Sequence, residues 1–146
     1  MKKTIIFITL LMTISIVNAQ NKSNILLGSW KIFKTISSTP QYHLNKEESK
    51  QFVGDTIVFQ LSRIIAPKNN TFYGGCSSPV YKFKTVNAME YYDNDRQYLK
   101  LIGCNTANIQ IAETSCGLPF ASIHIINKNE IDIGVDGYRY FLERIK

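Results

Sequence analysis

Alternating apolar and polar residues run through most of the chain and predict a protein made of β-strands. The first such stretch is 28–36, in which Trp30, Ile32 and Ile36 fall on one face. Gly28 at its start lets the backbone turn sharply into the strand. Further strands are expected, in chain order, at 56–61 with a continuation toward 66, and at 71–74, 80–86, 98–102, 109–114, 121–127, 130–135 and 138–145.

The connections between these stretches are short. Asp136-Gly137, between the last two, is the strongest short-range signal of a two-residue hairpin in the chain. About eight strands with such links favour an all-β fold over other classes. Within that class they favour an up-and-down antiparallel barrel, or a strongly bent sheet, over a Greek-key sandwich. The single tryptophan, Trp30, is expected to close one end of the barrel.

One short helix is expected near 46–53. Asn45-Lys46-Glu47-Glu48 has the form of a capping box, and Gly54 suits the end of a helix. A helix of this kind would cover one open end of the barrel. The pattern is least regular between 87 and 105, where 87–92 fits either one helical turn or a strand.

The first nineteen residues have the pattern of a secretory signal peptide. Lys2 and Lys3 form its basic start, 4–17 its apolar centre, and Val17-Asn18-Ala19 its cleavage site. The apolar run is shorter than the roughly 18 residues of a spanning helix. Removing 1–19 from the 146-residue chain leaves 20–146, a single β-barrel domain with no membrane span. We therefore expect a periplasmic or secreted protein.

The charge of the mature chain is modest. Fifteen basic residues face eleven acidic ones once Lys2 and Lys3 are removed, and the basic residues form no run of five or more. A nucleic-acid groove needs a concentrated basic surface, so the scattered pattern argues against nucleic-acid binding, as does export.

Three cysteines remain after cleavage, and an exported protein with this odd number can hold one disulfide and one free thiol. Cys76 and Cys116 both lie in loops with Gly or Pro neighbours, which favours their pairing. That bridge would add about 4 kcal/mol in the chain-entropy model. A pairing of Cys104 with Cys116, and three reduced thiols, are the alternatives that spacing leaves open.

Motifs that carry chemistry are sparse. Cys76 and His124 have the chain order of some cysteine-peptidase pairs, but no signature surrounds Cys76, and His124 alternates like an ordinary strand residue. His43 and His124, without a Cys-x-x-Cys motif, do not indicate zinc. Asp93 and Asp95 flank a turn, where solvated acids are usual. The chain is expected to be non-enzymatic and to use no metal or cofactor.

Aromatic and aliphatic residues are the remaining candidates for function. A barrel of about eight strands can be filled by side chains or can hold one small ligand. Inward tyrosines would give such a cavity apolar walls with hydroxyl tips. The hypothesised ligand-binding residues are Trp30, Phe59, Tyr81, Phe83, Ile125 and Tyr140. The alternative is a packed core with tyrosines at its edge.

The start of the first strand, Gly28-Ser29-Trp30, resembles the Gly-x-Trp motif of the lipocalins. The resemblance implies an eight-stranded up-and-down barrel with an apolar ligand cavity. It also implies an arginine near the end of the barrel that packs on the tryptophan, and Arg144 is the matching position, as a cation–π contact.

A second likeness covers nearly all of the mature chain. The Gly-x-Trp start, the helix ending at Gly54, Cys76-Ser77-Ser78-Pro79-Val80-Tyr81 and the closing 136–142 resemble small exported, lipocalin-like bacterial proteins of uncharacterised function. The resemblance implies Cys76–Cys116 as the disulfide and leaves Cys104 unpaired. It implies no activity.

These observations lead to two functional hypotheses. The first is an exported barrel that binds a small apolar or amphipathic ligand. The alternative is an envelope protein-interaction module, such as an inhibitor of a cell-wall hydrolase, that acts through the loops 74–79 and 115–120. An open interior of a few hundred Å³ would favour the ligand, whereas a filled core with an exposed apolar patch on the loops would favour the protein partner.

Overall fold

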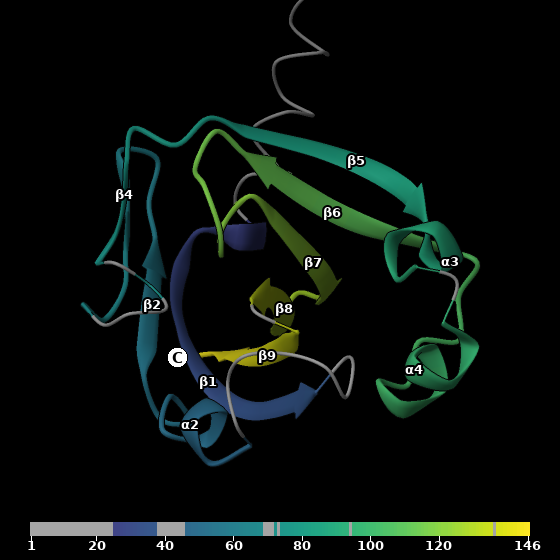
Figure 1. Ribbon diagram of the computed structural model, residues 1–146. Coiled ribbons are helices and arrows are strands. Elements are labelled where there is room, and N and C mark those ends of the chain that lie inside the picture. The colour runs from purple at the N-terminus through teal and green to yellow at the C-terminus, as the bar shows by residue number, and fades with distance from the viewer. Residues whose placement is uncertain (1–24, 38–45, 69–71, 73, 94, 136) are drawn as a thin grey trace, which may run out of the picture.

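The computed structural model describes residues 25–37, 46–68, 72, 74–93, 95–135 and 137–146 (Figure 1). The expected signal segment 1–19 and Asn45 of the predicted capping box lie outside these residues. The strands and helices are β1 (Gly28–Ser37), α2 (Lys46–Lys50), β2 (Thr56–Phe59), β3 (Arg63–Ile65), β4 (Gly75–Ser77), β5 (Tyr81–Asn87), α3 (Ala88–Tyr91), α4 (Arg96–Leu101), β6 (Asn108–Thr114), β7 (Ser122–Asn127), β8 (Glu130–Val135) and β9 (Tyr138–Arg144).

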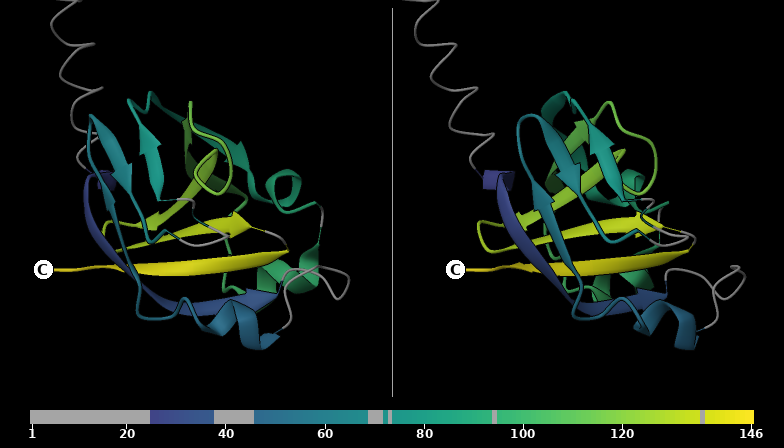
Figure 2. Two further views of the ribbon diagram at one scale, coloured as in Figure 1. Left: turned by 60° about the vertical axis from the view of Figure 1, so that its left-hand side comes forward. Right: turned by 90° about the vertical axis from the view of Figure 1, so that its left-hand side faces the viewer.

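The strands form one curled antiparallel sheet in the order β4-β3-β2-β1-β9-β8-β7-β6-β5 (Figures 1 and 2). Each strand pairs with the next along the chain except β4 with β5, and β9 returns to pair with β1. The prediction of an all-β, up-and-down antiparallel arrangement is therefore confirmed. The number of strands is nine rather than about eight, and the expected stretch 56–66 is divided between β2 and β3.

β4 and β5 are the two ends of the sheet, yet they follow one another in the chain. Since every pairing is antiparallel, the strand order gives β4 and β5 the same direction. Ser78 still bonds toward β3, because its N–H donates to the carbonyl of Ser62 at 2.8 Å. The carbonyl of Val80 already faces β6 and accepts from the N–H of Ser115 at 3.2 Å. Between Ser78 and Val80 the backbone thus changes the strand toward which it hydrogen-bonds, from β3 to β6.

The disulfide Cys76–Cys116 joins β4 to the loop that follows β6, with the two Cα atoms 6.0 Å apart. The predicted pairing is confirmed, and Cys104 is free and partly buried. Because β4 is one end of the sheet and β6 is next to the other, the bridge ties the two ends of the curled sheet together.

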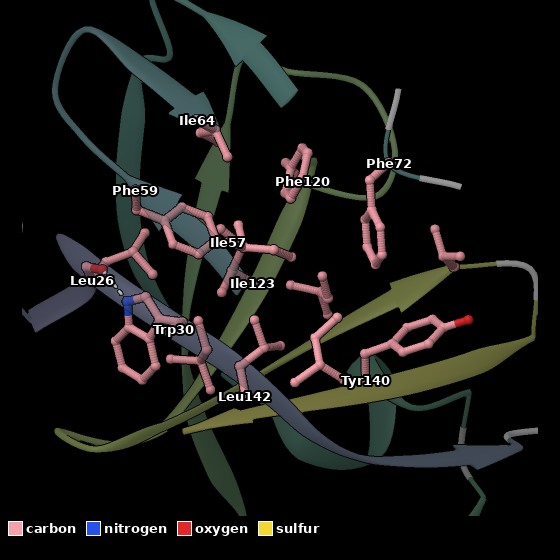
Figure 3. Packing of buried hydrophobic residues seen from close by; sticks show 14 of the residues in the cluster. Leu26, Trp30, Ile57, Phe59, Ile64, Phe72, Phe120, Ile123, Tyr140 and Leu142 are labelled. Carbon is pink, nitrogen blue, oxygen red and sulfur yellow. Dashed lines mark hydrogen bonds between the residues drawn. The ribbon is translucent and has the colours of Figure 1, made fainter. Parts of the chain in front are cut away.

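The inner face of the curl is filled with apolar side chains (Figure 3). Aromatic rings meet edge-on, with centroids 5.4 Å apart for Phe52 and Phe72 and 6.1 Å apart for Phe59 and Phe120. The helix predicted near 46–53 ends at Lys50; Phe52, in the turn that follows α2, packs into this core, whereas its neighbour Val53 is exposed. The buried residues of the core are Leu26, Trp30, Ile32, Phe52, Ile57, Phe59, Ile64, Phe72, Ala112, Cys116, Phe120, Ile123, Ile125, Ile131, Ile133, Val135, Tyr138, Tyr140 and Leu142.

A second, smaller cluster lies on the outer face, where side chains of α3, α4 and β6 pack together; Figure 1 shows α3 beside the ends of β5 and β6. It contains Ala88, Tyr92, Tyr98, Leu99, Ile109 and Ile111. The strand expected at 98–102 is wrong, because α4 occupies this stretch. Asp95 begins that helix by accepting from the N–H of Tyr98 at 2.8 Å, a local side-chain cap that outweighs the β-preference of the stretch.

Two expectations near the disulfide also need correction. Within 71–74, the described residues Phe72 and Gly74 lie in turns rather than a strand, and the expected loop 74–79 contains the strand β4. Gly75 permits this because its φ is +106° and an added Cβ would lie 1.9 Å from the carbonyl oxygen of Ile64.

Candidate functional site

The end of the curl that holds Trp30 is closed by Arg144. The guanidinium lies 4.2 Å from the centroid of the Trp30 ring. It also donates to three carbonyls, those of Ile25, Leu27 (2.7 Å) and Lys128 (2.9 Å). Gly28 makes room for it, because its φ is +132° and an added Cβ would lie 2.7 Å from Nη1 of Arg144. The three predicted structural residues, Gly28, Trp30 and Arg144, therefore meet at one place.

The six predicted ligand-binding residues share the interior of the curl. Trp30, Phe59, Ile125 and Tyr140 belong to the buried core, and Tyr81 and Phe83 are partly buried against it. Figure 3 shows several core side chains pointing toward one another, and Trp30, Phe59 and Tyr140 are at most 1 % exposed. Two surface hollows, of about 280 and 420 Å³, lie elsewhere, and Ile125 is the single member of the six that lines either.

Three loops meet beside the disulfide, and we call residues 60–62, 76–80 and 115–119 the rim. Besides the disulfide, hydrogen bonds connect all three loops. Tyr81 donates its hydroxyl to the carbonyl of Gln60 at 2.9 Å, and Val80 donates its N–H to Oγ of Ser115 at 3.0 Å. Burial raises the pKa of Tyr81 to about 12, so this hydroxyl stays a donor at neutral pH.

The rim exposes three large apolar side chains, one from each loop. Leu61, Val80 and Leu118 have exposed fractions of 67, 58 and 70 %. Beneath them the loop 115–120 is fixed, because Oγ1 of Thr114 donates to the carbonyl of Phe120 at 2.8 Å and Phe120 is buried in the core. The rim is thus a set of connected loops with apolar side chains turned to solvent. The two loops predicted to act together, 74–79 and 115–120, do lie together.

A second candidate lies on the outer face of β7, β8 and β9, and we call its residues Tyr91, Tyr92, His124, Asp132 and Arg139 the polar cluster. Asp132 is fully buried and its carboxylate accepts from Arg139 through one oxygen. Its other oxygen lies 2.7 Å from Nδ1 of His124 and 3.0 Å from the Tyr92 hydroxyl. The Tyr92 hydroxyl is also 2.5 Å from Nδ1 of His124.

The charges of the polar cluster compensate one another. Burial alone would raise the pKa of Asp132, but the Arg139 guanidinium and His124 hold the pKa of that carboxyl below its usual range. Burial and the Asp132 charge raise the pKa of Tyr92 above its usual range, so the phenol stays protonated and donates. Arg139 also lies over the rings of Tyr91 and Tyr92, 5.3 and 5.0 Å from the centroids. The arrangement fixes α3 to the sheet.

Sequence reasoning missed the polar cluster because His124 and Asp132 alternate like solvent-facing strand residues. The turn gave no signal either: closing the β7–β8 hairpin at Asn127 and Glu130 would set His124 opposite Ile133, and only the register shift between Ile125 and Asn127 brings it opposite Asp132. The Cys76/His124 pair is not available as a nucleophile and base, because Cys76 is bonded to Cys116. Among the described residues, no three His, Cys, Asp or Glu side chains gather as metal ligands.

Comparisons with protein-family models, with curated proteins and with solved structures return no match to this chain. Within the part of the chain that the structure describes, no helix has the length and apolar character needed to cross a bilayer.

Proposed function

We propose that this protein is an exported, non-enzymatic binding module that holds a protein partner at its rim. The observation that carries the proposal is the exposure of Leu61, Val80 and Leu118 on three connected loops beside one disulfide. Apolar side chains grouped in this way on a soluble domain are typical of interaction sites rather than of ordinary surface.

The way in which the loops are held supports binding to a protein. The disulfide, the bond from Val80 to Ser115 and the bond from Tyr81 to Gln60 restrict the rim before any partner arrives. A site that is ordered in advance loses less conformational entropy on association, so more of the apolar contact contributes to affinity. Leu118, the most exposed of the three, is expected to be the main contact.

Export and a lipocalin-like barrel form part of the same proposal. Disulfides persist mainly in oxidising compartments, which agrees with the signal pattern of 1–19. β4 and β5 run in one direction and are joined by three residues, so counting them as a single interrupted strand gives a barrel of eight strands. The contact of Arg144 with Trp30 is the one that the lipocalin resemblance implies.

The apolar ligand expected from the sequence has weaker support and stays a prediction. Trp30, Phe59 and Tyr140 are at most 1 % exposed, so a ligand between them would have to displace well-packed side chains. The partner that the rim accommodates best is therefore a protein with apolar side chains, as in the envelope-module hypothesis.

Site-specific photo-crosslinking tests the proposal. A photoreactive amino acid is placed at position 118 in the protein exported from its own cell, and at Leu101 on α4 as a control that is 60 % exposed and outside the rim. The expected result is one protein adduct from position 118 that position 101 does not give. With the captured partner purified, Leu118→Ser should weaken binding by about tenfold. The same crosslinked products from positions 118 and 101, or an unchanged affinity of Leu118→Ser for the partner, would contradict the proposal.

A further inference from the structure

β5 ends the sheet, and its hydrogen bonds show which of its backbone groups point outward. Val80, directly before β5, pairs with Ser115, and Ala88, directly after it, donates its N–H to the carbonyl of Ala107 at 2.9 Å. Both bonds fit the register in which Lys84 lies opposite Ile111. Backbone groups alternate in direction along a strand, so the even-numbered residues of β5 bond toward β6.

The N–H and C=O groups of Phe83 and Thr85 must then point away from β6. Among the described residues, no backbone group bonds to them, because the sheet order ends at β5. β4 does not serve them, because it stands at the other end of the sheet order and pairs with β3 but not with β5. β5 is accordingly seen at an outer edge of the curl (Figure 1). An edge of this kind is a template for one more strand.

The side chains along this edge show which partner would fit. Lys82 and Lys84 are exposed on one face; Lys84 contacts Glu113 at 2.6 Å, and in the described part of the chain Lys82 has no ion pair. On the other face, Phe83 packs partly against the core and leaves apolar surface beside the edge. A second copy of the chain fits poorly, because antiparallel pairing of two β5 edges would bring lysines close to lysines.

We propose that the free edge of β5 binds an extended acidic segment of another polypeptide, which adds a strand to the sheet. Backbone bonds to Phe83 and Thr85 would hold the segment, its acidic side chains would lie near Lys82 and Lys84, and its apolar ones near Phe83. The inference goes beyond the rim and does not rest on it, because the observations that carry it are the register and charges of β5.

The direct test uses two synthetic peptides, one alternating glutamate with valine and one alternating lysine with valine. Binding of the glutamate peptide should slow amide hydrogen exchange at Phe83 and Thr85 and leave Lys84, whose N–H faces β6, unchanged. Affinity for the lysine peptide should be at least about tenfold weaker. Equal affinity for both peptides, or slowed exchange elsewhere but not at Phe83 and Thr85, would overturn the proposal.

Thr85→Pro separates strand addition from general attraction of charge. Proline removes an N–H that faces outward, so the bonds to β6 remain, and edge strands tolerate it. The glutamate peptide should bind this variant at least about tenfold more weakly, whereas Thr85→Val should bind it as the wild type does. Unchanged exchange at Gln110 shows that Thr85→Pro is folded. Leu118→Ser is expected to bind the peptide normally, which keeps failure at the rim distinct from failure at the edge.

Discussion

The two faces of β7, β8 and β9 are both buried, but by different means. The inner face carries isoleucines such as Ile123 and Ile133, packed among other apolar side chains. The outer face carries His124 and Asp132, buried beneath Tyr92 of the α3 region and joined by hydrogen bonds. An apolar side chain can be buried wherever its volume and shape fit, whereas each buried polar group needs a particular hydrogen-bond partner. The outer face should therefore tolerate conservative changes less well than the inner face.

Loss of the central carboxylate should have the largest effect. Asp132→Ala leaves the largely buried Arg139 without its counter-charge and should lower the free energy of unfolding by about 3–5 kcal/mol, measured by denaturant titration. The double variant Asp132→Leu, Arg139→Met removes both charges and should recover most of that loss. A loss below about 1 kcal/mol for Asp132→Ala would mean that the polar cluster contributes no more than a surface ion pair.

On the inner face, the size of the side chain should decide the outcome. Leu142 is fully buried, and Leu142→Ala should cost about 3 kcal/mol because a cavity remains. Leu142→Met keeps the volume and should cost less than about 1.5 kcal/mol. Equal losses for the two variants, measured by the same titration, would show that the inner face is as specific as the outer one.

A single methyl group should disturb the outer face. At Gly134, an added Cβ would lie 2.7 Å from Nη1 of Arg139, which must then move from Asp132. We expect Gly134→Ala to cost about 1–3 kcal/mol in thermal or chemical unfolding. Gly117→Ala is the matched control, since nothing lies within 4 Å of its added Cβ, and it should change stability by less than about 0.5 kcal/mol. Similar losses of stability for the two substitutions would show that Gly134 is not needed to make room for Arg139.

The smallest expected effect is on the dependence of stability on pH. The pKa of Asp132 is lower in the folded than in the unfolded protein, where it is about 3.9. Its contribution is therefore fully present above pH 3.9 and is lost as the pH falls through the folded value. The free energy of unfolding of the Asp132→Leu, Arg139→Met variant should fall less steeply below about pH 4. Identical slopes would show that other carboxyls dominate acid unfolding.

Much of the fold could be predicted from the sequence because the alternation of apolar and polar residues marks most of its strands. Alternation put Trp30 with Ile32, and Ile57 with Phe59, on one face of each strand, and all four lie in the core. It also put Ile36 with Trp30, but the register shift between Ile32 and Lys34 sets Ile36 against the second cluster instead. Asp136-Gly137 predicted the hairpin that joins β8 and β9. Prediction failed where a single side-chain contact decides the conformation of the backbone. The cap at Asp95 turned an expected strand into α4.

The candidate sites were predictable only in part. Loop composition favoured, and the resemblance to exported proteins implied, the pairing of Cys76 with Cys116, which brings two of the three loops of the rim together. The strand expected at 56–61 included Leu61, but β2 ends at Phe59 and leaves Leu61 in an exposed turn. His124 and Asp132 were not recognised as buried, because their burial depends on α3 and α4, which alternation does not reveal.

Buried side chains pack the interior of the curl, and we propose that binding takes place outside it. Native mass spectrometry of the protein purified from its own cell envelope, without reduction, tests this claim most directly. We expect the mass of the mature polypeptide, alone or with a protein partner, and no change when lipids are added. A small-molecule adduct that is retained in the native state and released on denaturation would contradict it and would restore the apolar ligand as the function of the barrel.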